Sequence, residues 1–362
     1  MIADTSTEPD YVVEVQNLQK FFPVTRGFLR RVVGQVKAVD GVSFSVRRGE
    51  TLALVGESGC GKTTTGRCVM RAIEPTGGRT VYRVRPAADP VDINGLDKKE
   101  LRQFQRHAGM IFQDPYSSLN PRLTILEIIG EPFVTRKVVR TRRELEERVA
   151  ELLSSVHLDP TYMRRYPHAF SGGQRQRIAI AHALALRPAF IVADEPVSAL
   201  DVSVQAQILQ LLKELQNELR LTYLFVAHSL AVVEYISDRV AVMYLGKIVE
   251  LGQTEEIFSN PKHPYTEALL SAVPTISEKA AKKQRIVLEG DVADSMNVPN
   301  GCSFHPRCRY AAEVCRSEPP PLVNVAADGA PPHFTLCHFA TSLALEGVVI
   351  SAVAGMPVTN QT

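Results

Sequence analysis

The chain has 362 residues, enough for one large domain with an appendage or for two ordinary domains. Hydrophobic residues make up 45% and charged residues 22%, as is ordinary for a soluble globular protein. The formal net charge of +2 gives no global reason to expect nucleic acid as the main partner, and none is predicted.

Neither end of the chain predicts an export signal or a membrane anchor. The first ten residues, MIADTSTEPD, are acidic and polar. The apolar stretch 339–355 is interrupted by Glu346 and rich in small residues, so we do not expect it to span a membrane. The expected compartment is therefore the cytosol, where thiols stay reduced. The six cysteines are then expected to be free thiols or metal ligands.

The first third of the chain predicts strand, glycine loop and helix in that order. Residues 36–46 carry Val42, Phe44 and Val46 on one face, as in a half-buried strand. A buried strand is expected over 51–56, and a helix follows the glycine loop and ends before Pro75. Residues 79–113 are less regular, and we expect 81–97, with two prolines, to loop out.

The next segments alternate between helical and strand patterns. Residues from about 123 to 186 read as helical, and the basic stretch 136–148 alternates with carboxylates, as on a solvated helix face. Further on come a buried strand at 189–195, an amphipathic helix at 204–219, a strand at 221–228 and a hairpin turning at Gly246 and Lys247. This alternation predicts an α/β layered core.

The composition changes after Pro261. Residues 274–285 are polar and Lys-rich, as in a linker or exposed helix, and residues 288–340 are rich in Pro and Cys with little periodicity. We therefore divide the chain into a nucleotide-binding domain at 11–260, with a helical part at about 114–186, and a small appended domain at 261–340. The tail 341–362 is expected to be disordered.

The segment GESGCGKT, residues 56–63, fits the phosphate-loop pattern G-x-x-x-x-G-K-[ST]. Glycines let backbone N–H groups turn toward phosphate oxygens, and the helix that follows adds its positive N-terminal end. Lysine reaches the β- and γ-phosphates, and the final hydroxyl binds Mg²⁺. The residues predicted to contact ATP here are Gly56, Glu57, Ser58, Gly59, Cys60, Gly61, Lys62, Thr63 and Thr64.

Four side chains near strand ends could complete a hydrolytic site. Asp194 is predicted to hold Mg²⁺ together with Thr63, and Glu195 to polarise the attacking water; alternatively the two acids cap a helix. Gln113 could bring its amide to Mg²⁺ and the water, or lie on the surface. His228 could contact the γ-phosphate, or have a structural role.

Taken together, these motifs resemble the ATP-binding cassette family over about residues 11–251. FSGGQ, at 170–174, resembles the family signature with Phe170 in place of the more usual Leu, SALD at 198–201 resembles the D-loop, and His228 the switch histidine. LQKFF resembles the segment whose aromatic side chain stacks on adenine, which gives that role to Phe22 unless it is a core residue. The resemblance implies a P-loop NTPase with a RecA-like core, an antiparallel β subdomain and a helical signature subdomain.

The resemblance also gives the second glycine-rich loop a role. In this family two cassettes pack head to tail, and the signature of one closes over the ATP held by the other. It implies that these residues serve a partner's nucleotide: Ser171, Gly172, Gly173, Gln174 and Asp201.

Residues 114–122, 196–201 and 260–274 resemble more narrowly the second ATPase subunit, or F-type, of oligopeptide and dipeptide importers. That implies two transmembrane permease subunits, a second ATPase subunit that we expect to be a paralogue, a substrate-binding protein, and a peripheral position on the cytoplasmic face of the membrane. The segment after Gln113 would receive a permease helix. Nickel chelates or glutathione remain alternative cargoes, and a soluble translation or repair factor and a metabolic kinase are the rival classes.

Four cysteines, Cys302, Cys308, Cys315 and Cys337, have the spacing C-x₅-C-x₆-C-x₂₁-C. A cluster of thiols in a segment with few apolar residues suggests a metal that supplies stability. Zinc sites usually have tighter pairs, so a [4Fe–4S] cluster is the first expectation. The resemblance supports it, since some peptide-importer ATPases carry such a cluster. Zinc and free thiols are the alternatives.

Overall fold

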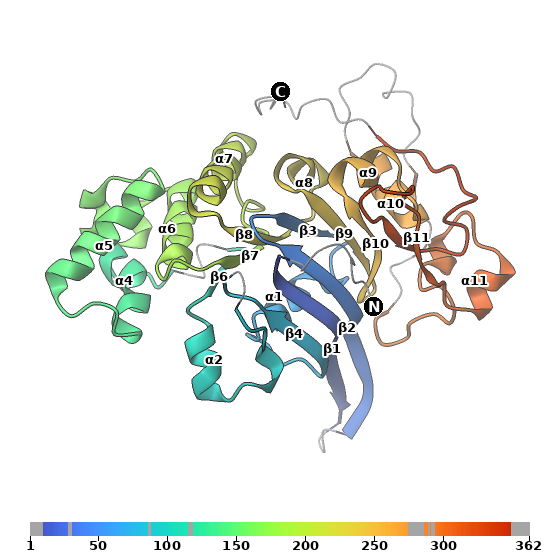
Figure 1. Ribbon diagram of the computed structural model, residues 1–362, viewed down its shortest axis with the longest axis horizontal. Coiled ribbons are helices and arrows are strands. Elements are labelled where there is room, and N and C mark those ends of the chain that lie inside the picture. Colours follow the sequence, from blue (N-terminus) through green and yellow to red (C-terminus); the bar gives the residue numbers. More distant parts are fainter. Residues whose placement is uncertain are drawn as a thin grey trace.

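The computed structural model describes residues 10–27, 31–85, 88–114, 119–273, 286–288, 290 and 294–348. Two β-sheets form the middle of the molecule (Figure 1). The helices α4, α5 and α6 lie at one end of the long axis, and the C-terminal region lies at the opposite end.

A four-stranded antiparallel sheet has the order β2-β1-β4-β5. Its strands are β1 (Tyr11–Arg26), β2 (Arg31–Arg47), β4 (Gly77–Tyr82) and β5 (Val91–Asp92). The expectation that residues 81–97 loop out is therefore wrong in part. Tyr82 pairs with Val91 across β4 and β5, and its buried ring packs edge-on against Phe104 and Phe190. Helix α2 (Lys98–Phe104) follows.

The main sheet has eight strands in the order β11-β12-β10-β9-β3-β8-β7-β6. The run from β9 to β6 is parallel, and these strands are almost entirely buried, which explains their unbroken apolar sequences. The strands are β3 (Thr51–Val55), β6 (Ala108–Ile111), β7 (Phe190–Asp194), β8 (Thr222–Val226), β9 (Arg239–Tyr244), β10 (Lys247–Gln253), β11 (Leu322–Asn324) and β12 (Phe334–Leu336).

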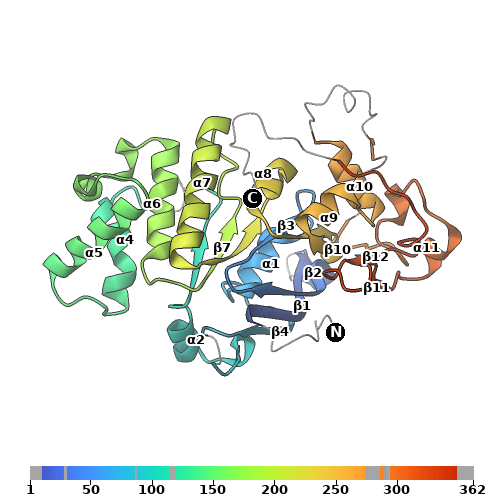
Figure 2. The ribbon, with the colours of Figure 1, turned by 45° about the horizontal axis from the view of Figure 1, so that its top comes forward.

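Helices cover both faces of the main sheet. Alternate residues of β3 pack into different cores: Ala53 and Val55 on the side of α7 (Val202–Leu219), and Leu52 and Leu54 on the side of α1 (Lys62–Val69). Helix α1 lies between the two sheets (Figure 2). The predicted α/β layered core is thus present, and the ends of its parallel strands carry the loops discussed below.

The helical part consists of α4 (Ile125–Thr135), α5 (Arg142–Ser155) and α6 (Gly172–Leu184), as the sequence pattern predicts. Two short 3₁₀ helices, Pro160–Arg164 and Pro167–Ala169, connect α5 to α6. Exposed ion pairs at i,i+4, Arg142–Glu146 and Arg143–Glu147, confirm the solvated face of α5, whereas residues 136–141 of the predicted stretch precede this helix.

The C-terminal region continues the main sheet instead of folding as a separate layer. Strand β12 pairs with β10, and the buried Glu250 of β10 accepts hydrogen bonds from His333 (2.8 Å) and from the backbone N–H groups of Lys262 (2.6 Å) and His263 (3.0 Å). The remaining elements are α8 (Leu230–Ile236), α9 (Thr254–Ser259), α10 (Pro264–Ser271), a 3₁₀ turn (His305–Arg307) and α11 (Glu313–Ser317).

Several expectations concern residues beyond the described ranges. The linker predicted at 274–285 lies outside them, as do residues 349–362 of the predicted tail. Within the tail, the backbone N–H of Val348 donates to the carbonyl of Phe258 at 2.8 Å. Of the helices described, none is both long and apolar enough to cross a bilayer.

Candidate functional site

The phosphate loop lies between β3 and α1, as predicted, and two of its glycines are enclosed by backbone. Gly61 has φ 108°, and a Cβ there would lie 2.0 Å from the carbonyl oxygen of Ala38. Gly56 has φ 151°, and its Cβ would lie 2.1 Å from the carbonyl oxygen of Met243. Neither position therefore tolerates a side chain. A pocket of about 370 Å³ opens over the loop, lined by Ala38, Ser58, Gly59, Gly61, Lys62, Thr63, Thr64, Gln113, Glu195 and His228.

Lys62 is folded against its own loop. Its side-chain ammonium donates to the carbonyl oxygens of Gly56 at 2.8 Å and Glu57 at 2.9 Å, and the residue is 5% exposed. Cys60 turns its thiol inward, where burial raises its pKa. The side chains of Cys60 and Glu57 do not line the pocket, so a contact of either with ATP would come from the backbone.

Asp194 and Thr63 meet as a magnesium site requires. The Thr63 hydroxyl donates to Asp194 Oδ1 at 2.8 Å, while Asp194 Oδ2 is buried without a hydrogen-bond partner, 3.8 Å from Arg67. Burial raises the pKa of Asp194, and the Thr63 hydrogen bond and the nearby Arg67 oppose that rise. An orphaned carboxylate oxygen beside a hydroxyl fits Mg²⁺, which prefers oxygen ligands and would supply the missing partner.

Gln113, Glu195 and His228 converge just after β6, β7 and β8. The Gln113 amide donates to Glu195 Oε2 at 2.8 Å, and His228 Nδ1 lies 3.4 Å from the same oxygen. Glu195 has φ 47°, a left-handed conformation that costs energy for a non-glycine residue and is typical of functional sites. The carboxylate thus faces the pocket rather than capping a helix, and His228 is 58% exposed, which speaks against a core role.

Phe22 lies on β1 opposite Val36 of β2, at the edge of this site. Val36 is two positions from Ala38, which lines the pocket over the phosphate loop. Phe22 is 37% exposed, with the Lys20 ammonium 4.9 Å from its ring centre, so it is not a core residue. It does not line the pocket over the phosphate loop, and its contact with adenine remains a prediction.

The signature segment forms the start of α6. The Ser171 hydroxyl accepts from the N–H of Gln174, whose side chain accepts from the N–H of Ser171, which is a capping box. Phe170 is buried with its ring edge-on to Tyr162. Asp201 caps α7 through the N–H of Val204 at 3.0 Å. None of Ser171, Gly172, Gly173, Gln174 or Asp201 lines the pocket over the phosphate loop.

Two contacts of the phosphate loop carry no signal in the sequence. The backbone N–H of Glu57 donates to the hydroxyl of Tyr265 in α10 at 2.8 Å. The Arg307 guanidinium donates two hydrogen bonds to the Glu57 carboxylate, of 2.7 and 3.0 Å. Glu57 and Arg307 are 250 positions apart, so no local pattern could have joined them.

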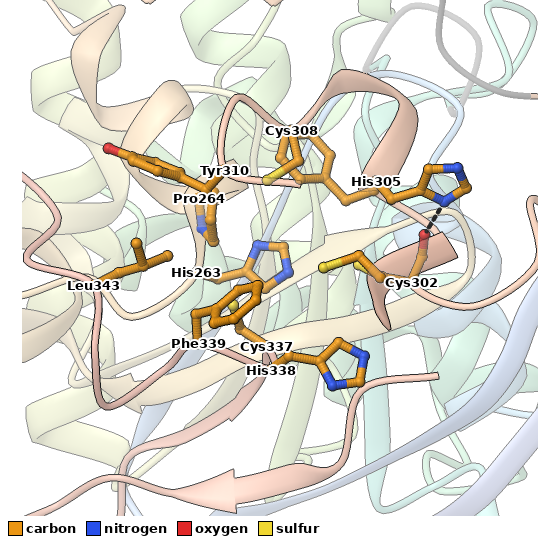
Figure 3. A pocket seen from close by; sticks show the side chains of 12 residues that line it. His263, Pro264, Cys302, His305, Cys308, Tyr310, Cys337, His338, Phe339 and Leu343 are labelled. Carbon is orange, nitrogen blue, oxygen red and sulfur yellow. Dashed lines mark hydrogen bonds between the residues drawn. The ribbon is translucent and has the colours of Figure 1, made fainter. Parts of the chain in front are cut away.

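The four C-terminal cysteines border one pocket, with His263 and Phe304 among its other walls (Figure 3). Burial raises the pKa values of Cys308 and Cys337 to about 11, and the neighbouring thiols add to the rise. Within the described ranges, no three His, Cys, Asp or Glu side chains gather closely enough to hold a single metal ion. The free space between the walls is about 10 Å³, room for roughly one water molecule.

A strand, phosphate loop and helix on a parallel sheet, with Asp194 and Glu195 beside them, define a P-loop NTPase. Comparison with known proteins gives the family. A family model described as "ABC transporter" matches residues 39–198. A second one, described as "Oligopeptide/dipeptide transporter, C-terminal region", matches residues 249–315. The chain belongs to the ATP-binding subunits of ABC transporters and is an ATPase of the ABC type.

Individual relatives agree with this assignment. The chain is 50% identical to the oligopeptide transport ATP-binding protein AppF of Bacillus subtilis, over 92% of this chain and 99% of the relative. It is 50% identical to the dipeptide transport ATP-binding protein DppF of Haemophilus influenzae, over 84% and 90%. A dimeric ATP-binding cassette, MJ0796, bound to ADP and Pi, superposes with a TM-score of 0.58 at 30% identity, over 67% of this chain and 98% of that chain.

Proposed function

We propose that the chain hydrolyses ATP to power a membrane importer of peptides. The observation that carries the proposal is the pairing of a phosphate loop, flanked by the residues for hydrolysis, with a C-terminal region that matches the one described for oligopeptide and dipeptide transporters. The curated relatives, which this chain matches over nearly their whole length, are named as oligopeptide and dipeptide transport proteins. Nickel chelates or glutathione are the alternative cargoes.

Different residues in and beside the pocket would bind the phosphates, bind Mg²⁺ and activate the attacking water. Backbone N–H groups of the phosphate loop and Lys62 would hold the phosphates, after Lys62 leaves the carbonyls it now contacts. Thr63 and Asp194 would hold Mg²⁺, with Gln113 nearby, and this ion neutralises charge on the phosphates. Glu195, held by Gln113, would polarise the attacking water, and His228 would contact the γ-phosphate.

We infer that the signature of a second cassette completes this site. Ser171 is exposed at the start of α6, and Ser171 to Gln174 all lie outside the pocket of their own chain. A helix N-terminus is suited to bind phosphate, and the related cassette MJ0796 is dimeric. A paralogue as the second cassette fits the resemblance to the F-type subunit.

A groove between the helical part and the main sheet is a suitable dock for a permease helix. The groove has a volume of about 400 Å³. Its apolar lining residues include Phe133, Val138, Leu152, Leu184 and Leu219, and its charged lining residues are Arg106, Arg148, Arg187 and Glu151. We infer that a cytoplasmic permease helix with an apolar face and an acidic residue binds there, which would hold the chain at the membrane. Helix α4, on one wall, is reached through the segment after Gln113, part of which lies outside the described residues.

Val138→Asp, with Val134→Asp as control, tests the function and the groove together. Val138 lines the groove, whereas Val134 is 57% exposed and does not. Tagged wild-type chain should pull down the permease and its substrate-binding protein with membranes, and cells should take up labelled peptide. Val138→Asp should abolish both and Val134→Asp neither. Loss of the chain without any effect on peptide uptake would contradict the proposed function.

We further propose that the four C-terminal cysteines bind a [4Fe–4S] cluster with a structural role. Four thiols around one pocket match the donor set of such a cluster, and the spacings between the cysteines are wider than the close pairs usual in zinc sites. The pocket as described, with about 10 Å³ of free space, is too small for the cluster, so its walls would have to move apart.

Anaerobic purification tests the cluster. The protein should be brown and contain about four irons per chain. Cys308→Ser should remove the colour, whereas Cys68→Ser, which changes a buried cysteine outside this pocket, should retain it. A colourless protein with one tightly bound zinc would identify a zinc site, and a protein without either metal would leave free thiols.

A further inference from the structure

Residue Glu57 of the phosphate loop is held by the C-terminal region at two points. Tyr265 of α10 accepts a hydrogen bond from its backbone N–H, and Arg307, in the turn between Cys302 and Cys308, binds its carboxylate through both terminal nitrogens. Backbone and side chain of one residue are thus fixed independently.

The Arg307–Glu57 pair is better protected than a surface ion pair. The Arg307 side chain is 7% exposed and that of Glu57 26%. The hydroxyl of Tyr244 lies beside the guanidinium, and the rings of Tyr244, Tyr265 and Phe304 pack against one another at 4.7 to 5.4 Å between centroids. A guanidinium–carboxylate pair with two hydrogen bonds is directional and strong, and the three packed aromatic rings hold Arg307 in the orientation that this pair needs.

Two physical effects would connect this pair to ATP binding. When Lys62 moves to the phosphates, the carbonyls of Gly56 and Glu57 lose its hydrogen bonds, so other contacts must keep the loop in shape. A loop fixed in advance loses less conformational freedom when the ligand binds. In addition, an unpaired Glu57 carboxylate would repel the triphosphate, and Arg307 neutralises it.

We propose that Arg307 is a positioning residue for ATP binding, through which the C-terminal region sets the affinity of the phosphate loop for ATP. Arg307 does not line the pocket over the phosphate loop, so it acts through Glu57. A second attachment supports the role of this region, since the backbone N–H of Lys37 in β2, next to Ala38, donates to the carbonyl of Ser295 at 3.1 Å.

The test compares Arg307→Met with Arg309→Met in the full-length chain. Arg309 lies two positions further on and pairs with the buried Glu267 at 3.0 Å, so its loss removes an ion pair of the same region that does not touch the phosphate loop. Binding of ATP with Mg²⁺ is measured at equilibrium, together with Tm. Arg307→Met should weaken ATP binding about tenfold or more, and Arg309→Met less than about twofold whatever its Tm.

A rescue separates positioning from a general loss of stability. In Arg307→Met the Glu57 carboxylate is left unpaired beside the triphosphate, so adding Glu57→Gln should recover part of the lost affinity although it restores no ion pair. In the assembled transporter, Arg307→Met should raise KM for ATP with little change in kcat. Should Arg307→Met not fold, Arg307→Lys, which keeps most of the packing, is compared with Arg309→Met in the same way.

Equal effects of Arg307→Met and Arg309→Met on ATP affinity would overturn the proposal, as would an unchanged affinity. A fall in kcat at constant KM would also contradict it, because Arg307 would then act on the chemical step.

Discussion

The phosphate loop and the signature segment are both rich in glycine, and the structure treats them very differently. A Cβ on Gly61 would meet backbone at 2.0 Å, and the C-terminal region holds Glu57 at two points. A Cβ on Gly172 would meet only a methyl group of Leu200 at 3.4 Å, and Ser171 is exposed with a cap made of its own neighbours. The phosphate loop is thus fixed within its own chain. The signature segment is a partly exposed helix start, where a Cβ on Gly173 would meet a Val204 methyl at 2.5 Å but no backbone, and we expect a second cassette to use it.

The largest effect should come from the carboxylate beside the phosphate loop. Glu195→Gln keeps the shape of the side chain but removes the base, so ATP hydrolysis should fall about 10²- to 10⁴-fold while ATP still binds. Steady-state turnover of the assembled complex and equilibrium ATP binding measure the two effects. Near-normal turnover would show that the catalytic base lies elsewhere.

Alanine substitutions at Gly61 and Gly172 test whether the backbone surrounds the phosphate loop more closely than the signature segment. Gly61→Ala places a Cβ against the carbonyl of Ala38 in a left-handed conformation, so we expect at least about 1–3 kcal/mol less stability and lost ATP binding. Gly172→Ala should cost less than about 1 kcal/mol, because its surroundings give way and alanine favours a helix. Urea unfolding of both variants makes the comparison, and equal losses would contradict it.

A smaller effect concerns the support of the phosphate loop at low pH. Burial lowers the pKa of His263 to about 3, and its Nδ1 accepts a hydrogen bond from the N–H of Tyr265. The unfolded pKa is about 6.5, so this contribution is complete above that pH and is lost as pH falls below it, by about 2 kcal/mol at pH 5. His263→Asn keeps an acceptor and should reduce this loss.

Urea unfolding at pH 7 and pH 5 compares wild type with His263→Asn. Other groups also titrate in this range, so the difference between the two proteins is the relevant quantity. Identical pH dependence would show that His263 does not couple to stability.

The sequence predicted which side chains gather beside the phosphate loop because they follow fixed motifs at the ends of buried strands. Asp194 and Glu195 end one strand, and parallel pairing brings Gln113 and His228 to the same edge. The contacts of the C-terminal region could not be predicted in this way. Strand β12 has three residues, too few for a visible alternation, and the contact of the buried Glu250 with His333 beside it joins residues 83 positions apart.

The hairpin between β9 and β10 shows the limit of local patterns. The predicted turn at Gly246 and Lys247 is shifted by one residue, because Leu245 and Gly246 both have positive φ, 43° and 79°. Two consecutive residues with positive φ are typical of a type I′ turn, whose first central residue is usually Asn or Gly. The leucine at position 245 therefore gave no signal for the turn.

The most direct test of the account is whether the two loops work across two chains. A chain with Lys62→Ala is mixed with one carrying Ser171→Ala, in a form that dimerises with itself; if this chain pairs only with a paralogue, the signature mutation is placed there. One composite site then carries both changes and the other is intact in both motifs. We predict that mixing restores part of the ATP hydrolysis that neither mutant has alone. If dimers form and no hydrolysis returns, the signature does not act on the partner's ATP.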